Sequence, residues 1–112
     1  MIVLLAACGR GPEAAVRRFL DIAASHQRDR LFEELGPATQ YRMKQDAERA
    51  ALMAGRRPVA PPQMLAVEVP PGAYRLRTLR HSGDEAEVEA EIVGYKQRFR
   101  CVRVAGKWKV EL

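Results

Sequence analysis

Aromatic residues are scarce in this chain, which has three Phe, three Tyr and one Trp among 112 residues. Surfaces that bind single-stranded nucleic acids stack the bases on exposed aromatic side chains. The shortage therefore argues against nucleic acid as a partner, and it leaves Val, Leu, Ile and Ala to build the core. The apolar fraction, 47%, is ordinary for a globular protein, so we expect a folded domain rather than disorder.

Cysteine and histidine are too few and too widely spaced to suggest a metal site. The chain has Cys8, Cys101, His26 and His81, and no two of them have the spacing of a metal-binding motif. A disulfide between the two cysteines would be allowed in an oxidising compartment. We expect no disulfide, because Cys101 lies in an apolar, strand-like run where a single cysteine behaves as a small buried hydrophobe. We expect no metal and no cofactor.

No apolar run approaches the ~20 residues that cross a bilayer. The first seven residues are nevertheless apolar and end in two alanines directly before Cys8 and Gly9. This order resembles a bacterial lipoprotein signal, in which the cysteine is lipidated and becomes the first mature residue. The run is short for a signal, whose apolar region is usually ~7–15 residues behind a basic stretch, so we expect the true translation start to lie upstream.

That resemblance divides the chain into a truncated signal segment at 1–7, a tether at 8–11 and a single domain at 12–112. It implies that Cys8 is the lipid attachment site and that the protein sits in the bacterial cell envelope, held to a membrane by this anchor. The alternative is a buried N-terminal strand or a frayed apolar end, which would leave the protein in the cytoplasm.

Helices are predicted in the first half of the domain. From Pro12, a residue suited to a first helical turn, apolar residues recur every three or four positions and predict a helix over 12–25. Asp29 can cap a short helix over 30–35. A third helix is predicted over 38–54, where the composition favours helix. Its apolar face is weak, so we expect a partly solvated lid.

Strands are predicted in the second half, where a proline-rich loop at 58–62 is followed by a change of apolar period from 3.6 to 2. The predicted strands cover residues 64–69, 74–80, 85–93, 95–104 and 107–112. The strand over 85–93 carries a row of glutamates that should face solvent, Glu87, Glu89 and Glu91. We expect arginines of the neighbouring strands to lie opposite this row. Helices followed by closely connected strands indicate an α+β fold, with N-terminal helices packed on a mostly antiparallel sheet of four to five strands.

Both ends of the domain resemble a known family. GPEAAVRRFL at 11–20 with LFEEL at 31–35, and EAEV at 85–88 with VAGKWKV at 104–110, are similar to the NTF2-like (cystatin-like cone) domains of small bacterial lipoproteins. The resemblance implies a curved antiparallel sheet wrapped around helices, with a pocket at the open end. Some members of the superfamily are enzymes, such as ketosteroid isomerase and polyketide cyclases, whereas many others are binding or accessory domains, so the fold leaves the function open.

Five residues are candidates for a functional role. An isomerase-like site needs a carboxylate base in an apolar pocket beside hydroxyl donors, and Asp46, Tyr41 and Tyr95 are the residue types available for a pocket. None of them falls on the family's motif, so we assign no catalytic residue. Arg56 and Arg57, in a chain of net charge +5, indicate contact with an anionic surface such as lipid headgroups.

The favoured function is a membrane-anchored lipoprotein whose domain binds a protein partner or a small apolar ligand without catalysis. Domains of this type often dimerise through the open face of the sheet, so a homodimer is also expected. Two alternatives stay open. One is an isomerase- or cyclase-like enzyme in the same cone, and the other is a cytoplasmic inhibitor or immunity-type interaction protein.

Overall fold

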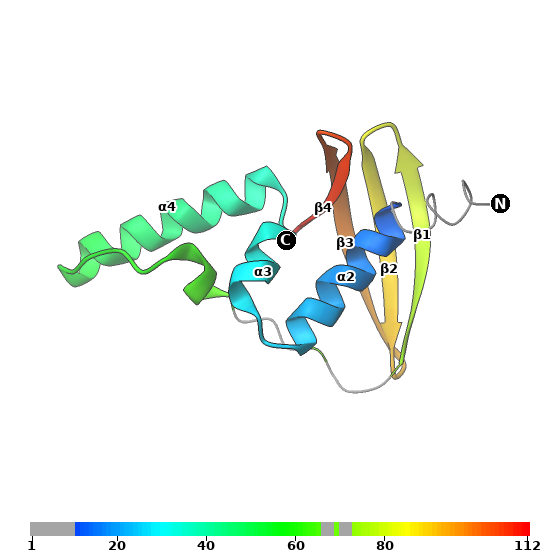
Figure 1. Ribbon diagram of the computed structural model, residues 1–112, viewed down its shortest axis with the longest axis horizontal. Coiled ribbons are helices and arrows are strands. Elements are labelled where there is room, and N and C mark those ends of the chain that lie inside the picture. The colour runs from blue at the N-terminus through cyan, green and yellow to red at the C-terminus, as the bar shows by residue number, and fades with distance from the viewer. Residues whose placement is uncertain (1–10, 66–68, 70–72) are drawn as a thin grey trace.

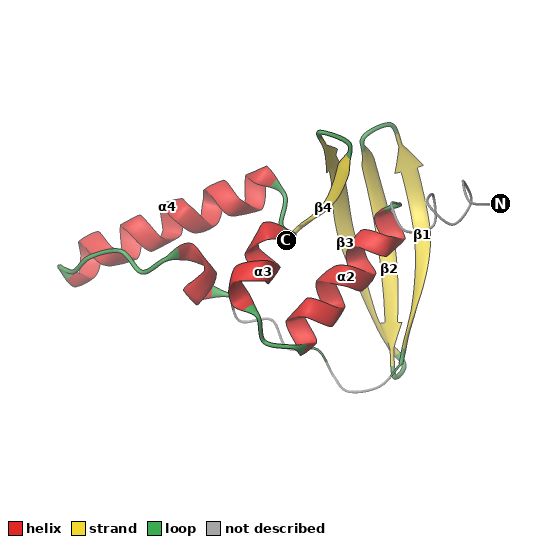
Figure 2. Cartoon of the chain, viewed as in Figure 1, coloured by secondary structure: helices red, strands yellow, loops and turns green. Residues whose placement is uncertain are grey.

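The computed structural model of the chain describes residues 11–65, 69 and 73–112 (Figure 1). Within these ranges the elements are, in chain order, α2 (Pro12–Ala24), α3 (Arg28–Glu33), α4 (Pro37–Ala54), the 3-10 helix η1 (Pro61–Met64), β1 (Tyr74–Ser82), β2 (Glu85–Ile92), β3 (Tyr95–Val104) and β4 (Lys107–Glu111). The helices precede the strands, and the predicted α+β class is confirmed (Figure 2).

The four described strands form one antiparallel sheet in the order β1-β2-β3-β4, with each strand next to its neighbour in the chain. Two-residue turns join β2 to β3 and β3 to β4. Both residues of each turn have positive φ: Val93 and Gly94 in the first, Ala105 and Gly106 in the second. Such turns match the right-handed twist of paired strands, which explains why the sheet is a simple series of hairpins.

Helix α2 covers the inner face of the sheet and closes the core (Figure 1). Its apolar side chains recur at helical spacing and are all buried: Ala15, Val16, Phe19, Leu20, Ile22 and Ala23. The alternate residues of the strands meet them, and the rings of Phe19 and Phe99 pack edge to face with centroids 5.8 Å apart. The predicted direction of the apolar and glutamate faces of β2 is confirmed, since the residues of β2 from Ala86 to Ile92 alternate between buried and half-buried.

The predicted strand over 64–69 is wrong at its first residue, because Met64 belongs to η1. Pro61 and Pro62 fix φ near the helical value and suit the first turn of a helix. Leu65 then turns a buried side chain into the core without joining the sheet. Residues 66–68 of this prediction lie outside the described residues.

The capping role predicted for Asp29 is also wrong. Helix α3 begins at Arg28, so Gln27 is the N-cap residue and Asp29 lies inside the first turn. A carboxylate there still interacts favourably with the positive end of the helix dipole. The acidic residue therefore correctly indicated a helix start in this region, but the helix begins at Arg28, before Asp29.

Helix α4 projects from the body of the molecule (Figure 1). Only Thr39, Ala47 and Ala51 are buried along its 18 residues, and the helix packs against η1. Its contact with the sheet is made with β4. The helix is therefore an arm beside the sheet, not the lid that its composition predicts.

Strand β1 is an edge of the sheet and carries a β-bulge. Its register with β2 shifts between Thr78 and Arg80, so that Leu79 has no partner residue in β2. Arg75, Arg77 and Arg80 alternate with inward-facing residues along this strand, and all three are exposed.

Candidate functional site

The space between α2 and the sheet, where a cone would hold its ligand, is filled with side chains. Phe19, Val88 and Val110 are completely buried there, and they belong to one continuous apolar cluster. The hollows described below lie on the surface instead.

The three residues available for an isomerase-like pocket do not come together. Tyr41 and Asp46 are exposed on α4, and the hydroxyl of Tyr41 accepts a hydrogen bond of 2.9 Å from the side chain of Gln45. Tyr95 follows the turn at the end of β2 and is 77% exposed. All three are exposed, whereas an isomerase-like site needs its carboxylate base inside an apolar pocket.

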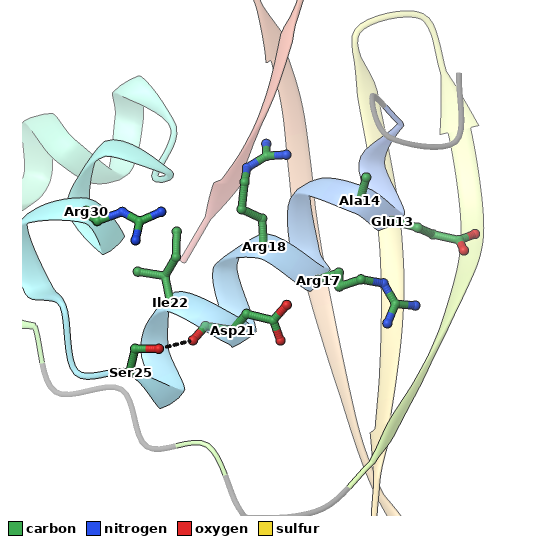
Figure 3. A pocket seen from close by; sticks show the side chains of 8 residues that line it. All are labelled: Glu13, Ala14, Arg17, Arg18, Asp21, Ile22, Ser25 and Arg30. Carbon is green, nitrogen blue, oxygen red and sulfur yellow. Dashed lines mark hydrogen bonds between the residues drawn. The ribbon is translucent and has the colours of Figure 1, made fainter. Parts of the chain in front are cut away.

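The first surface hollow, of about 640 Å³, runs along the solvent side of α2 (Figure 3). It is lined by Glu13, Ala14, Arg17, Arg18, Asp21, Ile22, Ser25 and Arg30. Arg17 stacks over the ring of Tyr74 at 5.5 Å, and the Tyr74 hydroxyl donates to the carboxylate of Asp21. Burial, together with this hydrogen bond, raises the pKa of Tyr74 to about 12. Tyr74 therefore stays protonated and acts as a fixed donor.

The second hollow, of about 630 Å³, lies between the end of α3 and the β3–β4 hairpin. Arg18 lines both hollows and pairs with Glu34 at 3.0 Å. Lys109 Nζ donates to the backbone carbonyl of Glu33 at 2.7 Å. Arg18, Glu34 and Lys109 thus have protein partners in this hollow. The sequence did not predict the hollow, because its residues come from three separate elements.

Among the residues that the structure describes, no group of three or more His, Cys, Asp or Glu side chains could hold a metal ion. His81 lies edge-on to Trp108, with ring centroids 5.1 Å apart, and His26 occupies a turn with positive φ. Both histidines therefore have structural surroundings.

The outer face of the sheet carries an ordered array of charge. The strand register places each of three glutamates of β2 between two cations, in the rows Arg75–Glu91–Lys96, Arg77–Glu89–Arg98 and Arg80–Glu87–Arg100. Ion pairs form at 2.8–3.4 Å between Arg77 and Glu89, Arg98 and Glu87, and Arg100 and Glu85. The arginines predicted opposite the glutamate row are confirmed, and each row keeps one positive charge in excess.

Glu89→Gln tests this array. We expect the free energy of unfolding to fall by only about 0.2–1 kcal/mol, because cross-strand ion pairs on a solvated face contribute little. The loss should shrink when the salt concentration rises, since salt screens exposed charges. Urea unfolding at low and high salt measures both effects, with Glu48→Gln on α4 as the control. A loss that salt leaves unchanged would contradict a screened surface interaction.

The two cysteines and the two arginines predicted to contact an anionic surface remain to be described. Cys8 lies outside the described residues. Cys101 is a free thiol with no exposed surface, and burial raises its pKa to about 12, as expected for a small buried hydrophobe. Arg56 and Arg57 are exposed directly after the end of α4.

None of the helices in the described part of the chain is long and apolar enough to cross a membrane. Comparisons of this chain with protein-family models, with curated proteins and with solved structures find no match. The likeness to NTF2-like domains therefore stays a prediction, and the function has to be argued from the residues.

Proposed function

We propose that this chain is a lipoprotein of the bacterial cell envelope, anchored to a membrane through a lipid on Cys8. The observation that carries the proposal is the apolar run that ends in Ala-Ala-Cys-Gly. It stops two residues before Gly11, the N-cap of α2. A lipidated Cys8 would thus lie within about 14 Å of chain from Pro12, the first residue of the helix, at 3.3–3.6 Å per residue.

The fold supports this reading because the described residues from position 11 onward already form a continuous apolar core. The apolar cluster begins at Ala15 in α2 and ends at Val110 in β4. Cys101 is enclosed in that cluster, so a disulfide to Cys8 would require opening the core. In the sequence Cys8 precedes the first described element, as an attachment point should.

We further propose that the domain is a non-catalytic binding or accessory module, with a protein partner or a small apolar ligand. Two contacts in the surface hollows support this, since Arg18 pairs with Glu34 and the carboxylate of Asp21 accepts a hydrogen bond from Tyr74, so these groups already have protein partners. The isomerase- or cyclase-like alternative gains no support from the separate positions of Tyr41, Asp46 and Tyr95. A homodimer stays a prediction, and the charged outer face of the sheet differs from the apolar core of known homodimer interfaces.

Cys8→Ser tests the anchor. In cells that make the full-length protein, we expect the unchanged protein in the membrane fraction and Cys8→Ser in the soluble fraction. Incorporation of a labelled fatty acid should be lost with the same substitution. Cys101→Ala is the matched control and should keep both the membrane location and the label.

If Cys8→Ser leaves both fractionation and labelling unchanged, the lipoprotein proposal fails. If the unchanged protein is soluble and unlabelled, the cytoplasmic inhibitor or immunity-type alternative becomes the better one.

A further inference from the structure

The free end of the α4 arm exposes two adjacent large apolar side chains. Leu52 and Met53 are 83% and 84% exposed, although they lie in the last turn of a regular helix. Gly55 ends this helix in the left-handed conformation, and the chain then turns back along the arm. Single exposed apolar residues are common on protein surfaces. The pair therefore indicates a binding site only if the neighbouring residues support one.

Cationic side chains outnumber acidic ones around the pair, where Glu48, one turn before Leu52, is the one acidic residue between positions 47 and 60. Arg49 lies one turn before the pair and Arg56 and Arg57 follow Gly55, while residues 49–60 contain no acidic residue. The ion pairs formed within the described residues all lie elsewhere in the fold. The side chain of Arg56 donates a hydrogen bond within its own segment, to the carbonyl of Arg57 at 3.3 Å. We call Arg49, Leu52, Met53, Arg56 and Arg57 the arm tip.

The chemistry of the arm tip points to one kind of partner. Exposed apolar side chains flanked by an excess of arginines, here three against the single acid Glu48, are the composition that binds the interface of an anionic bilayer. A specific protein interface buries about 800 Å² on each partner, which is a large area for the end of one helix. Insertion into lipid headgroups, in contrast, needs only the two side chains that are already exposed.

We propose that the arm tip is a lipid-binding site for anionic phospholipids. Leu52 and Met53 enter the headgroup region, and Arg49, Arg56 and Arg57 contact the phosphates. This contact does not require the lipid on Cys8. The arm tip and the first turn of α2 lie at opposite ends of the molecule (Figure 1), so a lipid on Cys8 and the arm tip would together hold the long axis of the protein along the membrane.

Vesicle binding of the full chain with Cys8→Ser tests this proposal without the lipid anchor. We expect binding to vesicles that contain phosphatidylglycerol and much weaker binding to vesicles of phosphatidylcholine alone. Arg56→Gln with Arg57→Gln should weaken the binding to anionic vesicles about 30-fold, from the usual contribution of each arginine near such a surface. Leu52→Ser with Met53→Ser should weaken it at least tenfold.

Matched controls separate the arm tip from general effects. Lys44→Gln with Lys107→Gln removes the same charge from other exposed positions, and Tyr95→Ser removes an apolar side chain that is exposed elsewhere. Neither control should change the binding, and circular dichroism should show every variant folded. Equal binding to both kinds of vesicle would overturn the proposal. So would an equal loss in the lysine control, which would assign the binding to net charge. Absence of binding to either vesicle would also overturn it and would favour an acidic protein as the partner of the arm tip.

Discussion

Phe19→Ala is expected to lower the free energy of unfolding by about 3–5 kcal/mol, the usual cost of deleting a buried aromatic ring. Phe19 has no exposed surface, and its ring packs edge to face on Phe99 across the interface between α2 and the sheet. Removing it leaves a cavity in the centre of the core, where neither the helix nor the strands can easily close. A domain of this size has only about 5–15 kcal/mol of stability to lose.

Urea unfolding followed by circular dichroism measures this loss. Tyr95→Ala is the control, since Tyr95 is an exposed aromatic residue whose truncation should change the free energy of unfolding by less than about 0.5 kcal/mol. If Phe19→Ala cost no more than this control, the packing of α2 on the inner face of the sheet would be refuted.

Glu111→Ala is expected to cost about 2–3 kcal/mol and to loosen the arm selectively. The Glu111 carboxylate accepts hydrogen bonds from the backbone N–H of Ala38 at 3.3 Å and of Thr39 at 2.8 Å, and from the Thr39 hydroxyl. These are unpaired donors in the first turn of α4, so an acid 72 residues away caps the helix. Thr39 is only 1% exposed and would lose a partner without gaining water.

Hydrogen exchange resolves the local part of this effect. We expect the amides of α4 to exchange faster in Glu111→Ala while those of β2 change far less, because the capped end is where the arm meets β4. Glu111→Gln is the matched control, since its amide oxygen still accepts a hydrogen bond and should keep part of the stability. An α4 that exchanges as slowly as in the unchanged protein would show that the cap does not hold the arm.

The same contact explains Gly36. A Cβ atom built on Gly36 would overlap the carboxylate of Glu111, and the backbone N–H of Gly36 donates to the carbonyl of Val110 at 2.8 Å. The turn before α4 and the last strand thus fit closely, which leaves no room for a side chain at Gly36.

The helices and hairpins could be predicted because their signals are local. Apolar spacing places α2, and strict alternation places β2, whose glutamates face outward. The strand expected at 64–69 fails at Met64 because apolar residues after a proline-rich loop carry no information about whether a neighbouring strand is free to pair. In the structure Leu65 lies outside the strands and is buried in the core cluster instead.

The arrangement of the surface could be predicted only in part. The arginines opposite the glutamate row follow from strand order, which the short turns determine. The cap from Glu111 to Thr39 and the two hollows that share Arg18 depend on contacts between distant segments. No periodic pattern in the sequence predicts the cap or the hollows, so they become visible only in the folded structure.

The bulge at Leu79 has a consequence for how copies of this protein behave when they are crowded. An open edge strand is a template on which a second molecule can add its own strand and start aggregation. The bulge interrupts the repeat that such pairing needs, and Arg75, Arg77 and Arg80 place like charges along the same strand. Both features oppose the pairing of β1 with a strand of a second molecule, so this edge favours monomers over sheet-to-sheet aggregates at high protein concentration.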